Sequence, residues 1–167
     1  MSRRYDVVVI GAGIHGAGVA QAAAVAGYRV LVLERTAIAA GTSSKSSKLI
    51  HGGLRYLESG QWGLVRASLR ERALLLRLAP DLVRAVPFHI PIYDTTRRGA
   101  FTVRMGLGAY ALLGGLAPTA RFSRVARAHW DRLDGLQTQD LRAVFRYYDA
   151  QTDDAALTRA VMRSAQQ

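Results

Sequence analysis

Three glycines near the N-terminus have the types and spacing of a loop that binds a phosphate group. Gly11, Gly13 and Gly16 form the pattern G-x-G-x-x-G directly after the β-branched run YDVVVI. The first glycine permits a tight turn, the second lets backbone approach a pyrophosphate, and the third allows close packing of helix on strand. The N-terminus of that helix would present free N–H groups to the anion. The segment therefore predicts a dinucleotide-binding turn.

An acidic residue follows at the distance at which such a turn is paired with a ribose-binding group. Glu34 closes the next hydrophobic run, YRVLVL. A carboxylate there can accept hydrogen bonds from ribose hydroxyls and would repel a 2′-phosphate, which favours FAD or NAD over NADP. The alternative is a glycine turn in an ordinary α/β sheet with an incidental glutamate.

The elements that must position these residues form a strand, a helix and a second strand. Residues 5–10 predict a strand buried on both faces, and residues 17–26 predict a helix rich in small side chains. Gly27 stands where a helix ends, and residues 28–33 predict the next strand. Two parallel strands joined by a helix are typical of an α/β sheet.

The later elements follow from helical spacing, proline and capping signals. We expect helices over residues 64–78 and 101–116, an edge strand or extended connection over 88–93, a strand over 145–148, and a helix over 154–165 capped by Asp153.

Composition excludes several classes of protein. Half of the 167 residues are hydrophobic, which is enough for a core, and the absence of cysteine excludes disulfide scaffolds, thiolate zinc sites and thiol catalysis. We expect no metal site. Two uncharged stretches, residues 7–28 and 105–120, contain too many glycines to be good membrane spans. A soluble or surface-bound protein is expected.

A hydroxyl-rich segment follows the second predicted strand. Residues 41–56 read GTSSKSSKLIHGGLRY, with five hydroxyl side chains, two lysines and paired glycines. Such a loop could cradle a long cofactor, and its glycines would let backbone approach a flat ring. The alternative is a flexible serine-rich linker.

At this point the sequence resembles a known family. IGAGIHGAGVAQAAAVAGYRVLVLE and GTSSKSSKLIHGGLRYLESG resemble the start of FAD-dependent, respiratory glycerol-3-phosphate dehydrogenases, which belong to the D-amino-acid-oxidase-like superfamily. The resemblance continues through LVRASLRERALLLRLAP, FHIPIY and FRYYDAQTDDAALTRAV, so it covers nearly the whole chain. SSKLIHGGLRYLE is its most specific part.

The resemblance implies FAD as the cofactor and assigns roles to residues. Arg55 matches an arginine of the substrate pocket, where a guanidinium suits a phosphate monoester, although a surface arginine is the alternative. His51 is a candidate base, but a histidine hydrogen-bonded beside the cofactor is the simpler interpretation. The catalytic base is expected beyond the end of the chain. The residues implied to bind FAD are Gly11, Gly13, Gly16, Glu34, Thr42, Ser43, Ser44, Ser46, Ser47, Lys48, His51, Gly52, Gly53 and Leu54.

The implied fold class is α/β, a partial Rossmann-like FAD-binding domain with the start of an inserted mixed α+β substrate domain. We expect the first part of the FAD-binding domain over residues 1–86, the insertion over 87–148, and a return to the FAD-binding domain over 149–167. The implied reaction oxidises sn-glycerol 3-phosphate to dihydroxyacetone phosphate, with electrons passed to a quinone. By this resemblance the chain is expected to be an N-terminal fragment of such an enzyme and to be inactive alone.

Two other functions remain open at this stage. One is an oxidase of the same superfamily that acts on an amine or amino acid, and the other is a non-catalytic basic module that binds nucleotide. The net charge is +11, and residues 61–132 contribute 12 arginines and no lysine. The resemblance implies a location in the cytoplasm, peripheral on the cytoplasmic face of the inner membrane. The excess of arginine would support attachment to anionic lipid, with a solvated surface as the alternative. No nucleic-acid-binding motif is visible, so no nucleic acid partner is expected.

Overall fold

The chain folds into two compact units, each described by itself. The structure is a computed structural model that describes residues 4–167. Unit 1 contains the described residues through Leu49 together with Thr152–Gln167, and unit 2 contains Ile50–Gln151. The domain boundaries expected after residues 86 and 148 separate a cofactor-binding part from a substrate-binding part. The division into compact units does not say which part binds which ligand, so these boundaries stay a prediction. Packing itself divides the chain near residue 50, because the segment from there to residue 86 packs with the later strands.

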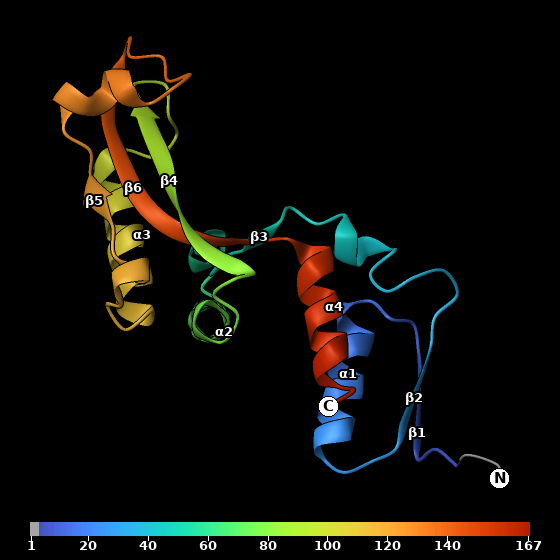
Figure 1. Ribbon diagram of the computed structural model, residues 1–167. Coiled ribbons are helices and arrows are strands. Elements are labelled where there is room, and N and C mark those ends of the chain that lie inside the picture. The colour runs from blue at the N-terminus through green and yellow to red at the C-terminus, as the bar shows by residue number, and fades with distance from the viewer. Residues whose placement is uncertain (1–3) are drawn as a thin grey trace. The chain divides into compact units, whose positions relative to one another are not determined.

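Unit 1 contains the predicted strand–helix–strand arrangement. Strand β1 (Val7–Ile10) pairs in parallel with β2 (Val30–Leu33), and helix α1 (Ile14–Val25) connects them. The helix begins at Ile14, earlier than expected, so its first turn includes the third glycine of the loop. Helix α4 (Asp154–Ser164) lies beside α1, as Figure 1 shows.

Gly27 ends α1 in the way that the sequence predicts. Its φ of 87° is left-handed, its N–H donates to the Ala24 carbonyl at 2.9 Å, and the Tyr28 N–H donates to the Ala23 carbonyl at 3.1 Å. These two bonds form a Schellman motif, which satisfies carbonyl groups that the helix end leaves free. The motif turns the chain back toward β2.

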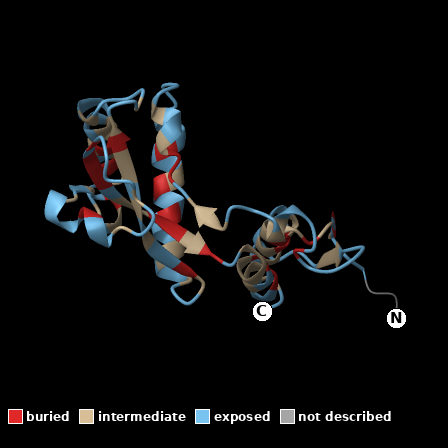
Figure 2. Cartoon of the chain, turned by 90° about the horizontal axis from the view of Figure 1, so that it is seen from above, coloured by how far each residue is buried: buried red, intermediate tan, exposed pale blue. Residues whose placement is uncertain are grey.

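The expectation that β1 is buried on both faces is wrong. Val9 is buried, but Val8 is 55% exposed and Ile10 is 87% exposed. Figure 2 shows the burial class of the described residues along the chain. Among the described residues β1 pairs only with β2, and α1 covers one face of the pair. The burial of this strand therefore alternates, as in a sheet covered on one side.

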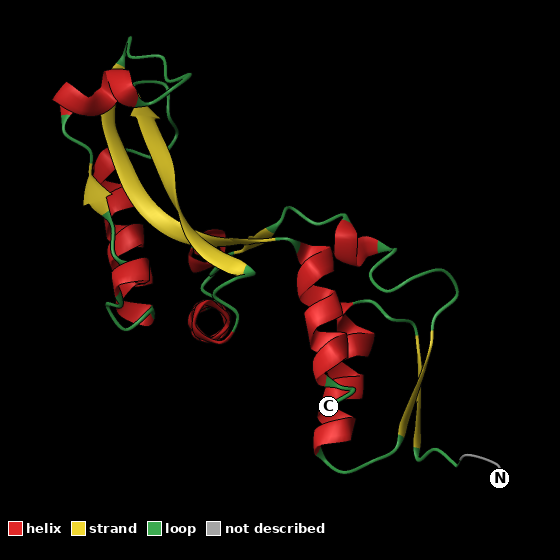
Figure 3. Cartoon of the chain, viewed as in Figure 1, coloured by secondary structure: helices red, strands yellow, loops and turns green. Residues whose placement is uncertain are grey.

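Unit 2 is built around one long strand, β6. The order of strands in its sheet is β3-β6-β4, and β5 also pairs with β6, in antiparallel orientation (Figure 3). The elements are β3 (Leu49–Ile50), α2 (Trp62–Leu78), β4 (Val83–Tyr93), α3 (Ala100–Leu113), β5 (Ser123–Arg124) and β6 (Leu141–Thr152), with 3-10 segments at Thr42–Ser44, Leu54–Leu57, Pro118–Ala120 and Arg127–Arg132.

Proline fixes the position of β4 in this sheet. Pro87 and Pro91 lie inside β4, which occupies an end of the strand order and so confirms the expected edge strand. A residue without an N–H is tolerated at an edge because one side of the strand needs no ladder bond. Residues from β4, α3 and β6 share the main core cluster: Ile92, Leu107, Ala143 and Phe145.

Candidate dinucleotide site

The glycine loop is too tight for larger side chains. Gly11 has a φ of 99°, which favours glycine, and its N–H donates to the Leu33 carbonyl at 2.7 Å. A Cβ on Gly16 would lie 1.9 Å from the Gly11 carbonyl oxygen. Helix α1 can therefore begin directly against the end of β1 only because glycine occupies position 16.

The start of α1 meets the hydroxyl-rich loop. Gly13 is the N-cap residue and supplies no side-chain cap. Instead, the Ser43 hydroxyl accepts a hydrogen bond of 2.9 Å from the Ile14 N–H. A Cβ on Gly13 would approach the Ser43 Oγ to 3.1 Å, so a larger residue here would require that hydroxyl to shift by a few tenths of an ångström. The helix end has a positive partial charge, and the N–H groups of its first turn that Ser43 does not bond can receive an anion.

Glu34 folds over the glycine loop. Its Oε2 accepts from the Ala12 N–H at 2.7 Å and its Oε1 accepts from the Thr36 N–H at 2.9 Å. These backbone bonds, led by that from Ala12, hold the pKa of the carboxyl below its usual value, so Glu34 is ionised at neutral pH. A carboxylate has about four acceptor positions, which leaves the exposed group able to bind a hydroxyl as well.

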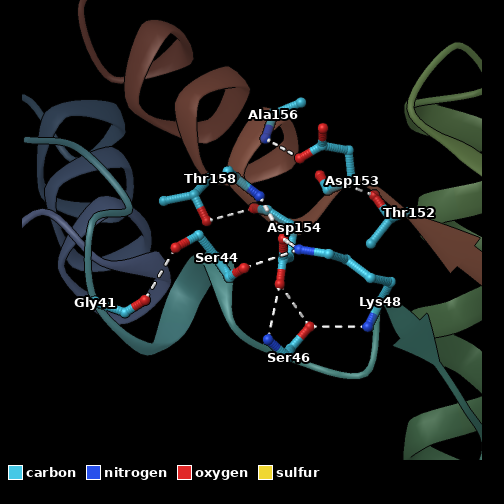
Figure 4. Close-up of polar contacts among 10 residues, drawn as sticks. Gly41, Ser44, Ser46, Lys48, Thr152, Asp153, Asp154, Ala156 and Thr158 are labelled. Carbon is cyan, nitrogen blue, oxygen red and sulfur yellow. Dashed lines mark hydrogen bonds and ion pairs between the residues drawn. The ribbon is translucent and has the colours of Figure 1, made fainter.

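The remaining residues of the hydroxyl-rich loop divide into two groups. Thr42 and Ser47 are exposed, and the Ser44 hydroxyl bonds its own turn through the Gly41 carbonyl at 3.1 Å. Ser46 and Lys48, by contrast, are engaged with α4 (Figure 4).

Asp154, in the first turn of α4, is the partner that Ser46 and Lys48 share. Its carboxylate forms an ion pair with the Lys48 ammonium and accepts from the Ser46 hydroxyl at 2.7 Å and the Ser46 N–H at 3.0 Å. The Lys48 Nζ also donates to the Ser44 carbonyl at 2.9 Å. Lys48 and Ser46 together hold the pKa of Asp154 well below its usual value. The network fixes the end of the loop against α4.

The paired glycines lie in unit 2. Gly52 and Gly53 are buried, whereas His51 is exposed and Leu54 is half-buried. Gly53 has a φ of 71°, and a Cβ there would lie 2.6 Å from the Tyr56 ring. The segment is therefore packed, which excludes the alternative of a flexible linker for these residues.

Arg55 lies in the 3-10 segment that follows. Its side chain is exposed, and no ion pair within residues 4–167 includes it. Its guanidinium is thus available to an anion. His15, inside the glycine loop, is also exposed.

A buried polar cluster beside Gly52 was not predicted from the sequence. Arg72 of α2 forms an ion pair of 2.6 Å with Asp149 of β6, and the Tyr110 hydroxyl of α3 joins them. A signal was present: Arg72 follows Val65 and Leu69 at helical spacing, so it lies on the apolar face of its helix.

A parallel strand–helix–strand unit with a glycine loop at the helix start, closed by an acidic residue from the second strand, defines a dinucleotide-binding α/β protein. Residues 6–167 match the family of FAD dependent oxidoreductases, and the chain belongs to this family. The polar groups of unit 1 fit FAD, because the N–H groups of a helix N-terminus can donate to its pyrophosphate and the Glu34 carboxylate can accept from its adenosine ribose.

Individual relatives give a finer comparison. Glycerol-3-phosphate dehydrogenase of Mycobacterium leprae is 43% identical over 98% of this chain, which spans 28% of that protein. The crystal structure of glycerol-3-phosphate dehydrogenase from Bacillus halodurans complexed with FAD is 27% identical, with a TM-score of 0.62 over 98% of this chain and 25% of that one. Glycine oxidase from Geobacillus kaustophilus shares the fold, with a TM-score of 0.69 at 21% identity over 99% of this chain and 45% of that one.

Proposed function

We propose that this chain carries the FAD-binding residues of an enzyme that oxidises sn-glycerol 3-phosphate to dihydroxyacetone phosphate. The observation that carries the proposal is the glycine loop closed by Glu34 and Ser43, in a chain 43% identical to a protein named glycerol-3-phosphate dehydrogenase. Membership of an oxidoreductase family argues against a non-catalytic basic module.

The residues of unit 1 bind the adenine end of the cofactor in this proposal. Gly11, Gly13 and Gly16 keep the N-terminus of α1 open to the pyrophosphate, and Ser43 adds a hydroxyl beside it. Glu34 accepts from the ribose with the acceptor positions that its backbone bonds leave free. Thr42, Ser44 and Ser47 belong to the same loop and offer it further hydroxyl groups. Ser46 and Lys48 act by holding this loop to Asp154.

The residues of unit 2 serve the reacting end. The Arg55 guanidinium grips the phosphate of the substrate through paired N–H donors, for which its free, exposed side chain is suited. Residues 51–54 give the cofactor a closely packed wall, with His51 as a hydrogen-bonding neighbour. Bound FAD supplies the oxidant that takes a hydride equivalent from the alcohol carbon.

Flavin retention and spectral response test this function. The chain purified with FAD is expected to keep a flavin spectrum after desalting. Binding of sn-glycerol 3-phosphate is expected to shift that spectrum without reducing the flavin, while glycerol does not shift it. Arg55→Ala should abolish the response to the phosphate ester without releasing flavin. Arg70→Ala, at an exposed position of α2, is the matched control and should keep the response. A response to glycine but not to the phosphate ester would instead favour an amino-acid oxidase.

The electron acceptor in this proposal is a quinone, and the location is the cytoplasmic face of a membrane. Among residues 4–167 no helix has both the length and the hydropathy needed to cross a bilayer. Helix α3 has a different feature: Phe101, Met105 and Leu112 are exposed on one helical face. With Arg97 and Arg104 nearby, this apolar stripe is suited to lie in the surface of an anionic bilayer.

Vesicle binding tests the membrane location. The chain is expected to sediment with vesicles containing anionic lipid, less with purely zwitterionic vesicles, and less at high salt because exposed charges are screened. The double variant Phe101→Ser/Met105→Ser should lose this binding, while Leu78→Ser, an equally exposed change on α2, should not. Equal binding by all three proteins would contradict a role for α3.

A further inference from the structure

We propose that Tyr110, Arg72 and Asp149 are positioning residues that hold the Gly52 backbone, and through it residues 51–54, in the shape that binds the cofactor. The cofactor part of this inference rests on the proposed function. The three residues come from α3, α2 and β6 and meet at one backbone N–H group of unit 2.

The Gly52 N–H is the point on which the cluster converges. It donates to the Tyr110 hydroxyl at 3.0 Å and to Asp149 Oδ1 at 3.3 Å. Tyr110 and Asp149 are 1% and 6% exposed, so both bonds form away from water. A buried N–H without an acceptor is costly, and the chain at Gly52 is therefore kept turned toward these oxygens.

Arg72 holds the two acceptors in place. It is 2% exposed, and its Nη1 donates to Asp149 Oδ1 at 2.6 Å and to the Tyr110 hydroxyl at 3.2 Å. Its Nη2 donates to the Thr119 carbonyl at 2.9 Å, which ties the guanidinium to a further segment. Because the planar guanidinium donates to several acceptors at once, it fixes the Asp149 carboxylate and the Tyr110 hydroxyl relative to each other.

The tyrosine keeps its proton in this environment. Burial raises the pKa of Tyr110 well above its ordinary value. The neutral hydroxyl can donate to Asp149, at 3.3 Å, while it accepts from Gly52 and Arg72. Gly52, Tyr110, Asp149 and the two terminal nitrogens of Arg72 therefore each have a donor or acceptor role, while the buried Arg72 Nε has no partner among the described residues.

Close packing makes the arrangement specific to glycine. A Cβ at Gly52 would lie 2.3 Å from the Tyr110 hydroxyl oxygen and 2.4 Å from Leu69 Cδ2. The Gly52 backbone is thus pressed against the same hydroxyl that bonds it. An apolar cluster could fill this volume, but it would leave the buried Gly52 N–H without an acceptor. The polar cluster therefore supplies hydrogen-bond acceptors to the Gly52 N–H, which apolar packing would not supply.

Exchange of a single amide tests the positioning role in the chain without cofactor. Tyr110→Phe keeps the ring and removes the hydroxyl oxygen that accepts from Gly52. Hydrogen exchange at the Gly52 amide is therefore expected to accelerate about tenfold, which corresponds to the loss of one hydrogen bond. Tyr147→Phe is the matched control, because this ring packs edge-on 6.2 Å from that of Tyr110 but does not bond Gly52. Unchanged exchange at Gly52 in Tyr110→Phe would overturn the proposal.

Cofactor affinity gives the second readout. Tyr110→Phe is expected to bind FAD about tenfold more weakly than Tyr147→Phe. Its melting temperature should also fall, because the buried Gly52 N–H and Arg72 each lose a hydrogen-bond partner. The double variant Arg72→Met/Asp149→Leu should fold yet show the same weakening, which separates positioning from mere stability. Full affinity in both variants would overturn the cofactor role. Absence of FAD binding by the unaltered chain would count against the proposed function, while Gly52 exchange would still decide the positioning role.

Discussion

The Glu34 carboxylate accepts a hydrogen bond of 2.7 Å from the Ala12 N–H, across 22 residues of sequence. This bond links the end of β2 to the glycine loop that follows β1. The acidic residue therefore has two tasks, because it shapes the phosphate-binding loop as well as offering acceptors to a ribose. Loss of the carboxylate should disturb both.

Glu34→Gln tests this double role. The amide offers one oxygen in place of two, so one of the N–H groups of Ala12 and Thr36 loses its acceptor. We expect FAD affinity to fall about tenfold, measured by fluorescence titration. Glu71→Gln, at an exposed position on α2, is the control and should bind FAD normally. Normal affinity in Glu34→Gln would show that the carboxylate contributes nothing specific.

Two glycines of α1 should respond in opposite ways to alanine. Gly16→Ala would place a Cβ 1.9 Å from the Gly11 carbonyl oxygen, whereas a Cβ at Gly18 meets nothing within 4 Å. We expect Gly16→Ala to lower the free energy of unfolding by about 2 kcal/mol and to weaken FAD binding. Gly18→Ala should raise it by about 0.5–1 kcal/mol, because alanine favours a helix interior. Denaturant titration measures both, and equal effects would contradict the loop geometry.

The glycine loop region could be predicted because its signals are local. Strand, glycine loop, helix, helix-ending glycine and acidic residue follow one another within residues 5–34, and each has its own residue pattern. The Asp153 cap was equally local, and its side chain accepts from the Ala156 N–H at 2.9 Å. What was wrong, the burial of β1 on both faces, concerns tertiary cover rather than local pattern.

Unit 2 was less predictable because its order depends on distant pairings. Strand β6 runs over Leu141–Thr152, far beyond the short strand expected at residues 145–148, because three other strands pair along it. Arg72 had a local signal in its helical spacing with Val65 and Leu69, but its partner had none, because Asp149 lies 77 residues away.

The Asp154 network makes a prediction about acid stability. Lys48 and Ser46 lower the pKa of Asp154 below its unfolded value, so the unfolded chain takes up the proton first as pH falls. The stabilisation is therefore complete above the ordinary carboxyl pKa of about 4 and is lost as pH falls through the folded value. Asp154→Asn should be less stable than the unaltered chain at pH 6, with a smaller further loss between pH 5 and 2.

Asp153→Asn provides the control for this measurement. It is the adjacent residue and undergoes the same chemical change, and asparagine caps a helix about as well as aspartate does. Its stability should therefore follow the unaltered chain between pH 6 and 2, as measured by urea unfolding at each pH. An equal pH response in Asp154→Asn and the unaltered chain would show that the ion pair with Lys48 does not form in solution.

The buried pair in unit 2 makes the largest stability prediction. Arg72→Met leaves Asp149 charged and unpaired in the core, which should lower the free energy of unfolding by about 3–5 kcal/mol. Adding Asp149→Leu removes the unpaired charge, and the double variant should recover most of that loss. Thermal and denaturant unfolding of the two single variants and the double variant complete the cycle. If Arg72→Met alone lost less than about 1 kcal/mol, the range of an exposed ion pair, Arg72 would have to reach solvent in the native chain.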